Sequence, residues 1–308
     1  MKRASVVPIE EGCVQREEYV SCFRASASGQ ARLFHQKFIP PKDLPVVAAV
    51  LFLHGVHEHS ARYVHVLEHL AKQGVVGFTY DQLSHGRSQC HSGRSKGTCE
   101  GFADFLEEAV ANARRIRGEH PALPLFVWGQ SFGGLVAAHV ALAAAAELFP
   151  APGKGGLVLT SPAFGIDPRP LDPLLRMVGR LLNRVLPNVP LVDVVQPGDM
   201  SKDPQAVRDY TDDPLNHMGK IRLRLGLSAE RAIKHLNDSA PQVKPSLVLL
   251  IGSNDKCVSL KQVKRVFAKL GSTDKELRIF EGVYHTMLHE PEKQQVMDAM
   301  TAFIMKHV

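Results

Sequence analysis

Uninterrupted apolar runs mark the predicted strands of a buried sheet. They cover residues 46–53, 75–80, 123–128 and 156–160. A strand that is covered on both faces has such a run, whereas a strand with one face in water alternates. Stretches with helical spacing lie between the runs at residues 61–73, 101–119 and 132–149. This alternation of strand and helix predicts a mostly parallel sheet flanked by helices, which is an α/β fold.

The same alternation of strand and helix returns near the end of the chain, whereas the start of the chain shows two successive strands. Strands at 247–251 and 276–280 and helices at 259–270 and 291–306 are predicted there. Residues 18–26 and 29–38 read as two strands around the turn pair Ser28-Gly29. Since this pair lets the chain reverse, the two strands predict a hairpin at one edge of the sheet.

Residues 162–241 predict an insert over the sheet, a helical cap that follows the sixth strand. Nine of the 20 prolines fall between Pro162 and Pro214, too many for regular sheet. The predicted organisation is therefore a core formed by residues 1–161 and 242–308, with the cap between its two parts.

One segment of the insert is amphipathic. Its apolar residues recur at helical spacing and are Leu171, Leu174, Leu175, Val178, Leu181, Leu182, Val185 and Leu186. Arg176, Arg180 and Arg184 repeat every four residues and form a basic face. The apolar face either packs on the protein's own domain or rests on an anionic membrane surface.

Composition narrows the class of protein. The chain has 308 residues, 44% hydrophobic and 22% charged, as in globular proteins rather than disordered ones. The net charge of +6 comes without a run of like charges, so no nucleic-acid partner is expected. The five cysteines form no Cys-x-x-Cys pair, and the basic start lacks the apolar run of a signal peptide. We therefore expect a cytoplasmic protein without a transmembrane helix, in peripheral contact with membranes at most.

The segment 129–133, Gly-Gln-Ser-Phe-Gly, follows a predicted strand and opens a predicted helix. This context is typical of a nucleophile elbow, in which a strained turn holds a serine hydroxyl above the sheet. Ser131 is therefore the candidate nucleophile. The alternative is a tight glycine turn with an idle serine.

A serine hydroxyl needs a base, and the base needs an orienting acid. In this fold the chain order is serine, acid, histidine, each at a strand end. Asp255 and His285 follow predicted strands in that order, which makes them the candidate acid and base. The alternatives are His289 as the base and, as the acid, a residue of the insert or an earlier strand end: Asp193, Asp199, Asp203 or Asp81.

Backbone amides must stabilise the oxyanion of an acyl-transfer intermediate. The expected donors are Phe132, directly after the serine, and Val56 in the loop after the strand at 46–53. The histidines of that loop and of the next helix also allow a metal site; they are His54, His57, His59, His65 and His69. Their spacing matches no metal-binding motif. We therefore expect neither a metal nor a cofactor.

Residues 54–63, 81–88, 129–134, 252–255 and 281–285 resemble the monoacylglycerol lipases of the α/β-hydrolase superfamily. The likeness runs from about residue 20 to the end and includes Asp213-Pro214-Leu215 in the insert. It implies a triad of Ser131, Asp255 and His285. The implied oxyanion donors are Val56 and Phe132.

The resemblance also implies supporting roles. Glu58 and Arg62 match the family's loop-bracing pair, and Tyr210 matches a cap tyrosine near the glycerol end of the site. Cys257 lies close to a position where the family has a cysteine. Two residues depart from the pattern: His57 replaces a usual glycine and Gln130 a usual histidine.

The expected function is therefore serine carboxylester hydrolysis, with a lipid ester, most simply a monoacylglycerol, as substrate. A lysophospholipase or a broad-specificity carboxylesterase of the same fold is the alternative. A non-catalytic binding protein on this fold is a further hypothesis. The sequence gives no indication of the oligomeric state.

Overall fold

The computed structural model describes the chain in five stretches, residues 13–25, 29–91, 95–165, 172–192 and 196–308. Ser28, Leu171 and Asp193 lie outside the described residues, as does the start of the chain. Within the described stretches, no helix is both long enough and apolar enough to cross a membrane.

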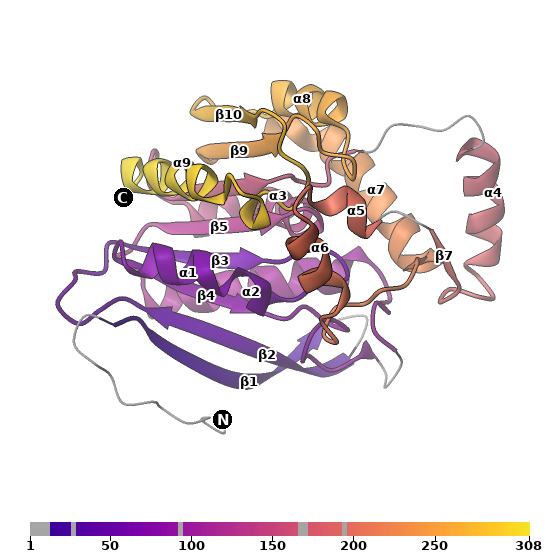
Figure 1. Cartoon of the computed structure of the whole chain (residues 1–308), viewed down its shortest axis with the longest axis horizontal. Helices are drawn as coiled ribbons and strands as arrows, with labels where there is room; N and C mark the ends of the chain where they lie inside the picture. The colour runs from indigo at the N-terminus through magenta and orange to yellow at the C-terminus, as the bar shows by residue number, and fades with distance from the viewer. Residues whose placement is uncertain (1–12, 26–28, 92–94, 166–171, 193–195) are drawn as a thin grey trace.

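One eight-stranded sheet runs through the centre of the molecule (Figure 1). Its strands are β1 Gln15–Ala25, β2 Gly29–Ile39, β3 Ala48–Leu53, β4 Val75–Tyr80, β5 Leu125–Gln130, β6 Gly156–Thr160, β9 Leu247–Gly252 and β10 Lys275–Phe280. The order is β1-β2-β4-β3-β5-β6-β9-β10. The β1–β2 hairpin and the β2–β4 pair are antiparallel, and the other pairs are parallel. The predicted α/β architecture with a hairpin edge is confirmed.

Helices cover both faces of the sheet. They are α1 Val64–Ala71, α2 Phe102–Glu119, α3 Phe132–Leu148, α8 Leu260–Lys269 and α9 Lys293–Lys306. In β3 the residues Leu51 and Leu53 join the core under α2, α3 and α8, whereas Val50 and Phe52 join the core under α1 and α9. Because successive side chains of a strand point to opposite faces, a strand between two cores must be apolar throughout.

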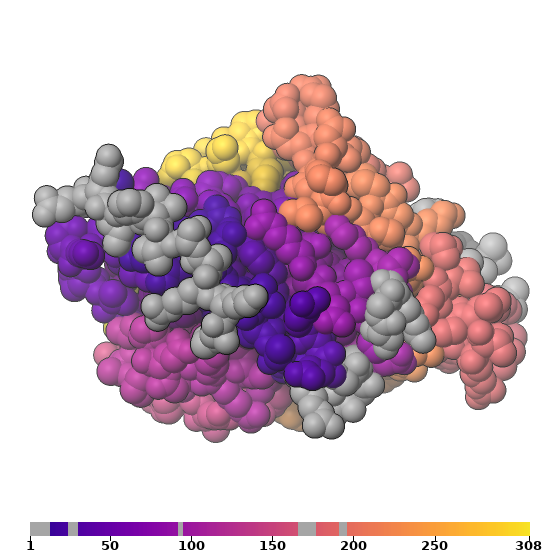
Figure 2. All heavy atoms as spheres, turned by 90° about the horizontal axis from the view of Figure 1, so that it is seen from below, coloured from indigo at the N-terminus to yellow at the C-terminus, as the bar shows by residue number. Residues whose placement is uncertain are grey.

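The insert lies between β6 and β9. It contains α4 Asp172–Leu182, β7 Pro190–Val192, α5 Pro197–Met200, α6 Pro204–Thr211, β8 Ile221–Arg222 and α7 Leu223–Ser239. Helix α4 stands apart from the sheet and its covering helices at one end of the molecule (Figure 1). Seen from the hairpin side, the segments of the insert, in salmon and orange, project beyond the core (Figure 2).

Two local expectations need correction. Strand β5 begins at Leu125 and ends at Gln130, two residues later than predicted at each end, because Gly129 and Gln130 still pair with β6. The amphipathic helix ends at Leu182 rather than continuing to Leu186, and residues 183–185 form a turn.

The apolar residues Val178 and Leu181 of α4 do not pack on the protein's own domain, whereas Leu182 is half-buried. Val178 and Leu181 are 51% and 59% exposed, and Val185 beyond the helix is 74% exposed. Instead, α4 meets α7 through the buried Gly179, where an added Cβ would lie 3.3 Å from Leu223. Of the two alternatives for this face, packing within the domain is therefore wrong for these residues.

Candidate active site

Ser131 lies in the sharp turn that joins β5 to α3. Its backbone has φ 52° and ψ −116°, an unfavourable conformation that costs about 1–3 kcal/mol. Flanking glycines allow this turn: a Cβ at Gly129 would lie 2.2 Å from the Gly133 carbonyl oxygen, and one at Gly133 would lie 2.0 Å from that of Leu53. The turn thus holds the Ser131 side chain at the carboxyl edge of the sheet, beside the first turn of α3.

Three side chains from separate strand ends form one chain of hydrogen bonds. Oγ of Ser131 lies 2.9 Å from Nε2 of His285, and Nδ1 of that ring lies 2.8 Å from Oδ2 of Asp255. Because Nδ1 faces a carboxylate, it carries the ring proton, and Nε2 accepts the hydrogen bond of the Ser131 hydroxyl. The arrangement can therefore move a proton from the hydroxyl to the imidazole.

The surroundings of His285 favour its charged form. The side chains of His285 and Asp255 are 4% and 0% exposed. Burial alone lowers the pKa of His285, but the charge and hydrogen bond of Asp255, helped by the charge of Glu58, raise the pKa above its usual 6.5. The site thus stabilises the imidazolium that forms when the ring takes a proton.

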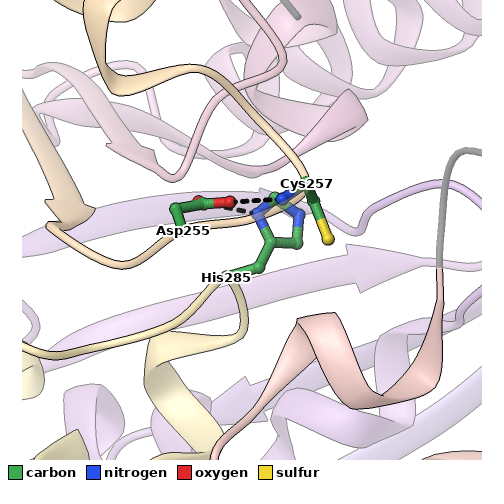
Figure 3. A group of neighbouring side chains, drawn as sticks. All are labelled: Asp255, Cys257 and His285. Atoms are coloured by element: carbon green, nitrogen blue, oxygen red, sulfur yellow. Dashed lines mark hydrogen bonds and ion pairs between the residues drawn. The ribbon is translucent and has the colours of Figure 1, made fainter.

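The loop after β9 fixes Asp255 through its own backbone. Oδ1 accepts hydrogen bonds from the amides of Cys257 and Val258 at 2.9 and 3.0 Å. Oδ2 is left for His285, as Figure 3 shows for the group of Asp255, Cys257 and His285. Each carboxylate oxygen has its own partners, so the carboxylate cannot rotate without losing hydrogen bonds.

The two expected oxyanion donors, the amides of Phe132 and Val56, belong to segments that adjoin Ser131. Phe132 is the first residue of α3, and the first amides of a helix have no acceptor within the helix. Val56 follows Gly55, whose added Cβ would lie 3.3 Å from Cβ of Ser131, so this loop lies against the serine. In the described part of the chain neither amide has a backbone acceptor. Both are available for an oxygen that develops negative charge beside Ser131.

Glu58 ties the loop of Val56 together. Its carboxylate accepts the amide of Gly55 at 2.7 Å and the hydroxyl of Tyr63 at 3.0 Å, and it pairs with Arg62 at 3.2 Å. The side chains of Glu58 and Arg62 are 3% and 6% exposed. Removing one partner of such a buried pair costs about 3–5 kcal/mol, so the pair holds the loop firmly.

Tyr210 brings α6 of the insert against this pair. Its side chain is buried, and its ring centroid lies 4.9 Å from the Arg62 guanidinium. Burial, together with the charge of Glu58, raises the pKa of the phenol, which stays neutral. Glu58, Arg62 and Tyr210 therefore form one polar cluster beneath the insert.

The insert is hydrogen-bonded to both sides of the site, which the sequence did not reveal. On one side, the carbonyl oxygen of Met200 accepts the amide and the hydroxyl of Thr286, each at 2.8 Å. On the other side, Asp213 pairs with His59 at 2.7 Å. The likeness of Asp213-Pro214-Leu215 to the family pattern was the only available signal.

His57 and Gln130, the two departures from the family pattern, are both buried. His57 has φ 66°, a left-handed conformation in which glycine avoids a cost of about 1–2 kcal/mol. Its carbonyl accepts the amide of His217 at 2.9 Å, and its ring meets that of His217 edge to face. The amide of Gln130 donates to the carbonyl of His285 at 3.3 Å and thereby braces the loop of the base.

The alternative acids and bases have other partners. His289 donates from Nε2 to the carbonyl of Arg62, and burial lowers its pKa well below the usual value. Asp199 lies 3.8 Å from Lys256, and Asp203 caps α6. Asp81 binds the loop residues Ser60 and Arg87.

Four of the five histidines that allow a metal site have hydrogen-bond partners, whereas Nε2 of the buried His57 has none among the residues that the structure describes. His54 donates to the Gly55 carbonyl and accepts the Gln82 amide, so both ring nitrogens are occupied. His65 and His69 bond to the Leu288 carbonyl and to Thr301. Within the described residues, the donor atoms that gather closely enough for a metal belong to Asp255, Cys257 and His285.

A family model described as serine aminopeptidase, S33 matches residues 45–292. The monoacylglycerol lipase of Mycolicibacterium smegmatis is 29% identical over 285 residues, 91% of this chain and 95% of that protein. The human monoglyceride lipase is 28% identical over 244 residues, 79% of this chain and 77% of that protein. The crystal structure of a Paleococcus ferrophilus monoacylglycerol lipase has a TM-score of 0.75 at 26% identity and covers 90% of this chain and 99% of its own.

Proposed function

The chain belongs to the serine aminopeptidase S33 family, has the α/β-hydrolase fold, and, we propose, hydrolyses monoacylglycerols to fatty acid and glycerol. The observation that carries the proposal is the hydrogen-bonded chain from Ser131 through His285 to Asp255. The Mycolicibacterium smegmatis monoacylglycerol lipase and the human monoglyceride lipase, both matched over most of their length, support this substrate class.

In the proposed reaction, Ser131 attacks the ester carbonyl while His285 takes its proton at Nε2. Asp255 keeps the other ring proton on Nδ1 and stabilises the imidazolium. The amides of Val56 and Phe132 donate to the tetrahedral oxyanion. His285 then protonates the leaving glycerol oxygen, and a water repeats the sequence on the acyl-enzyme to release the fatty acid.

The polar cluster beneath the insert supports a neutral polyol as the leaving group. Glu58 and Arg62 neutralise each other, and Tyr210 covers them, so no unpaired cation in this cluster is available to a phosphate. Burying an ionised phosphodiester there without a partner carries a large desolvation cost, whereas hydroxyl groups are satisfied by hydrogen bonds. This distinction separates the proposal from a lysophospholipase.

We expect fatty-acid release from a long-chain monoacylglycerol at a kcat/KM at least about tenfold above that from a lysophospholipid of the same acyl chain, equivalent to about 1.4 kcal/mol. Both substrates are assayed in identical detergent dispersions, with a short aryl ester as the reference for general esterase activity. Equal or greater turnover of the lysophospholipid would replace the substrate but keep the reaction class. Preference for the short ester would favour a broad-specificity carboxylesterase.

We propose that residues 162–241 act as a cap over the site, between the core segments 1–161 and 242–308. The contacts of Met200 with Thr286 and of Asp213 with His59 support this division of roles. The exposed side chains of Met177, Val178 and Leu181 on α4, with Arg180 next to them, further support peripheral membrane contact through the cap.

Replacing Val178 and Leu181 together by glutamine is expected to weaken binding to anionic vesicles about tenfold or more. Two apolar side chains that enter the lipid contribute roughly 1 kcal/mol each or more. Co-sedimentation with vesicles measures the effect. The matched control replaces Val20 and Val46 by glutamine. These two side chains lie outside the insert and are 46% and 42% exposed.

The control protein should bind vesicles like the wild type. Binding should also fall with added salt and on neutral lipid, because Arg180 and Arg184 are exposed. Equal losses in both double variants, or binding that ignores lipid charge and salt, would remove the membrane role of α4.

A further inference from the structure

The thiol of Cys257 lies beside the imidazole of His285, within the group drawn in Figure 3. Asp255, Cys257 and His285 each offer one donor atom, and these three atoms lie within 4.8 Å of one another. The turn that fixes Asp255 produces this closeness, because the Cys257 amide donates to Asp255. The proposed reaction does not use the Cys257 side chain.

We propose that Asp255, Cys257 and His285 bind zinc or a similarly thiophilic divalent ion, and that the bound ion switches off ester hydrolysis. Thiolate, imidazole and carboxylate are the three ligand types that zinc takes in proteins. Donor atoms around a tetrahedral zinc ion lie roughly 3.3–3.8 Å apart. The donor atoms lie at most 4.8 Å apart, so movements of about 1 Å close the group around an ion, and hydrogen bonds of Asp255 or His285 are exchanged for bonds to the ion.

The binding step is a proton exchange without redox chemistry. The Cys257 thiol loses its proton to water, and its sulfur lone pair forms the bond to the ion. A thiolate and the Asp255 carboxylate together carry two negative charges, which a divalent ion neutralises.

An ion on either ring nitrogen of His285 disables the base. If the ion takes Nε2, the lone pair that accepts the Ser131 proton is occupied. If the ion takes Nδ1, the ring proton moves to Nε2, and Nε2 can then no longer accept the Ser131 proton. Inhibition thus rests on the proposed function, whereas binding of the ion does not.

The candidate metal site is buried beneath the proposed cap. Cys257 is 8% exposed, and its sulfur lies 3.9 Å from the carbonyl oxygen of Asp199 in α5. Met200 and Tyr210, also from the cap, pack with Cys257 in one apolar cluster. The Asp199 carbonyl, the Ser131 hydroxyl or a water is a candidate for the fourth ligand.

The test compares Cys257→Ser with Cys90→Ser, which removes a half-buried thiol elsewhere. Cobalt(II) reports binding, because a cobalt–thiolate bond gives a near-ultraviolet charge-transfer band that needs no turnover. We expect the band in the wild type and in Cys90→Ser and its loss in Cys257→Ser. Zinc chloride should inhibit ester hydrolysis of the first two proteins at the same concentration. Cys257→Ser should need at least about ten times more, since loss of even an indirect supporting group weakens metal sites 10–100-fold.

A cobalt band that persists in Cys257→Ser, or equal zinc sensitivity of the two variants, would overturn the proposal. If Cys257→Ser unfolds, Cys257→Ala replaces it, with circular dichroism as the check on folding. A Cys257-dependent band in a protein that hydrolyses no ester would uphold the metal site and count against the proposed function instead.

Discussion

Replacing Ser131 by alanine is expected to lower kcat for ester hydrolysis by about 10⁴-fold or more. The variant keeps His285, Asp255 and the proposed oxyanion donors Val56 and Phe132 but has no oxygen that can attack the ester carbonyl. In serine hydrolases the remaining groups accelerate the reaction only about 10³–10⁴-fold over water. Fatty-acid release under single-turnover conditions measures the loss.

The matched control is Ser228→Ala, which removes a buried hydroxyl in α7 that donates to the Leu225 carbonyl. Its activity should stay near that of the wild type. A fluorophosphonate probe should label the wild type and the control but not the Ser131 variant, which also separates an enzyme from a binding protein of the same fold. Residual hydrolysis above about a thousandth of the wild-type rate would disprove the role of Ser131.

Asp255→Asn is expected to lower kcat about 10⁴-fold while the protein stays folded. The reason lies in the two backbone amides, those of Cys257 and Val258, that donate to Oδ1. They hold the carbonyl oxygen of the new amide in that position, so its NH₂ group must face His285. The Nδ1 atom then accepts a hydrogen bond, the ring proton moves to Nε2, and the base is lost.

Asp199→Asn provides the comparison for this variant. Asp199 lies near the same loop but pairs with Lys256 on the half-exposed surface. Its replacement should leave kcat within a few-fold, since exposed ion pairs contribute at most about 1 kcal/mol. The melting temperature of each variant checks the fold. A loss below tenfold in Asp255→Asn would mean that another group orients His285.

The meeting of Ser131, Asp255 and His285 at one edge of the sheet was predictable because each candidate is encoded locally. Ser131 follows β5, and Asp255 and His285 follow the neighbouring strands β9 and β10. In a parallel sheet all these strand ends point the same way, so residues far apart in sequence meet once the strands are identified. The apolar runs identified the strands, because both faces of the sheet are buried.

The cap was less predictable because its contacts are long-range and polar. Asp213 and His59 are 154 residues apart, and no periodicity relates them. The amphipathic pattern of α4 indicated a helix but not its partner, since the same pattern suits a protein core and a lipid surface equally. Likewise β5 extends through Gly129 and Gln130 because β6 pairs with them, although glycine is a weak strand former.

The hydrogen bonds from the insert to the loops of His285 and Val56 limit how the proposed cap can move. A rigid-body movement of α5 and α6 away from the core would break the hydrogen bond of Met200 with Thr286 and that of Asp213 with His59. Such a movement would displace the loops that carry His285 and Val56. The candidate catalytic residues would then lose their arrangement just as the lipid enters. Helix α4 meets α7 at Gly179, and among its described side chains Met177, Val178, Arg180 and Leu181 are exposed. The proposed cap would therefore admit an acyl chain on the side of α4, while the segments around Met200 and Asp213 keep their hydrogen bonds to the loops of His285 and Val56.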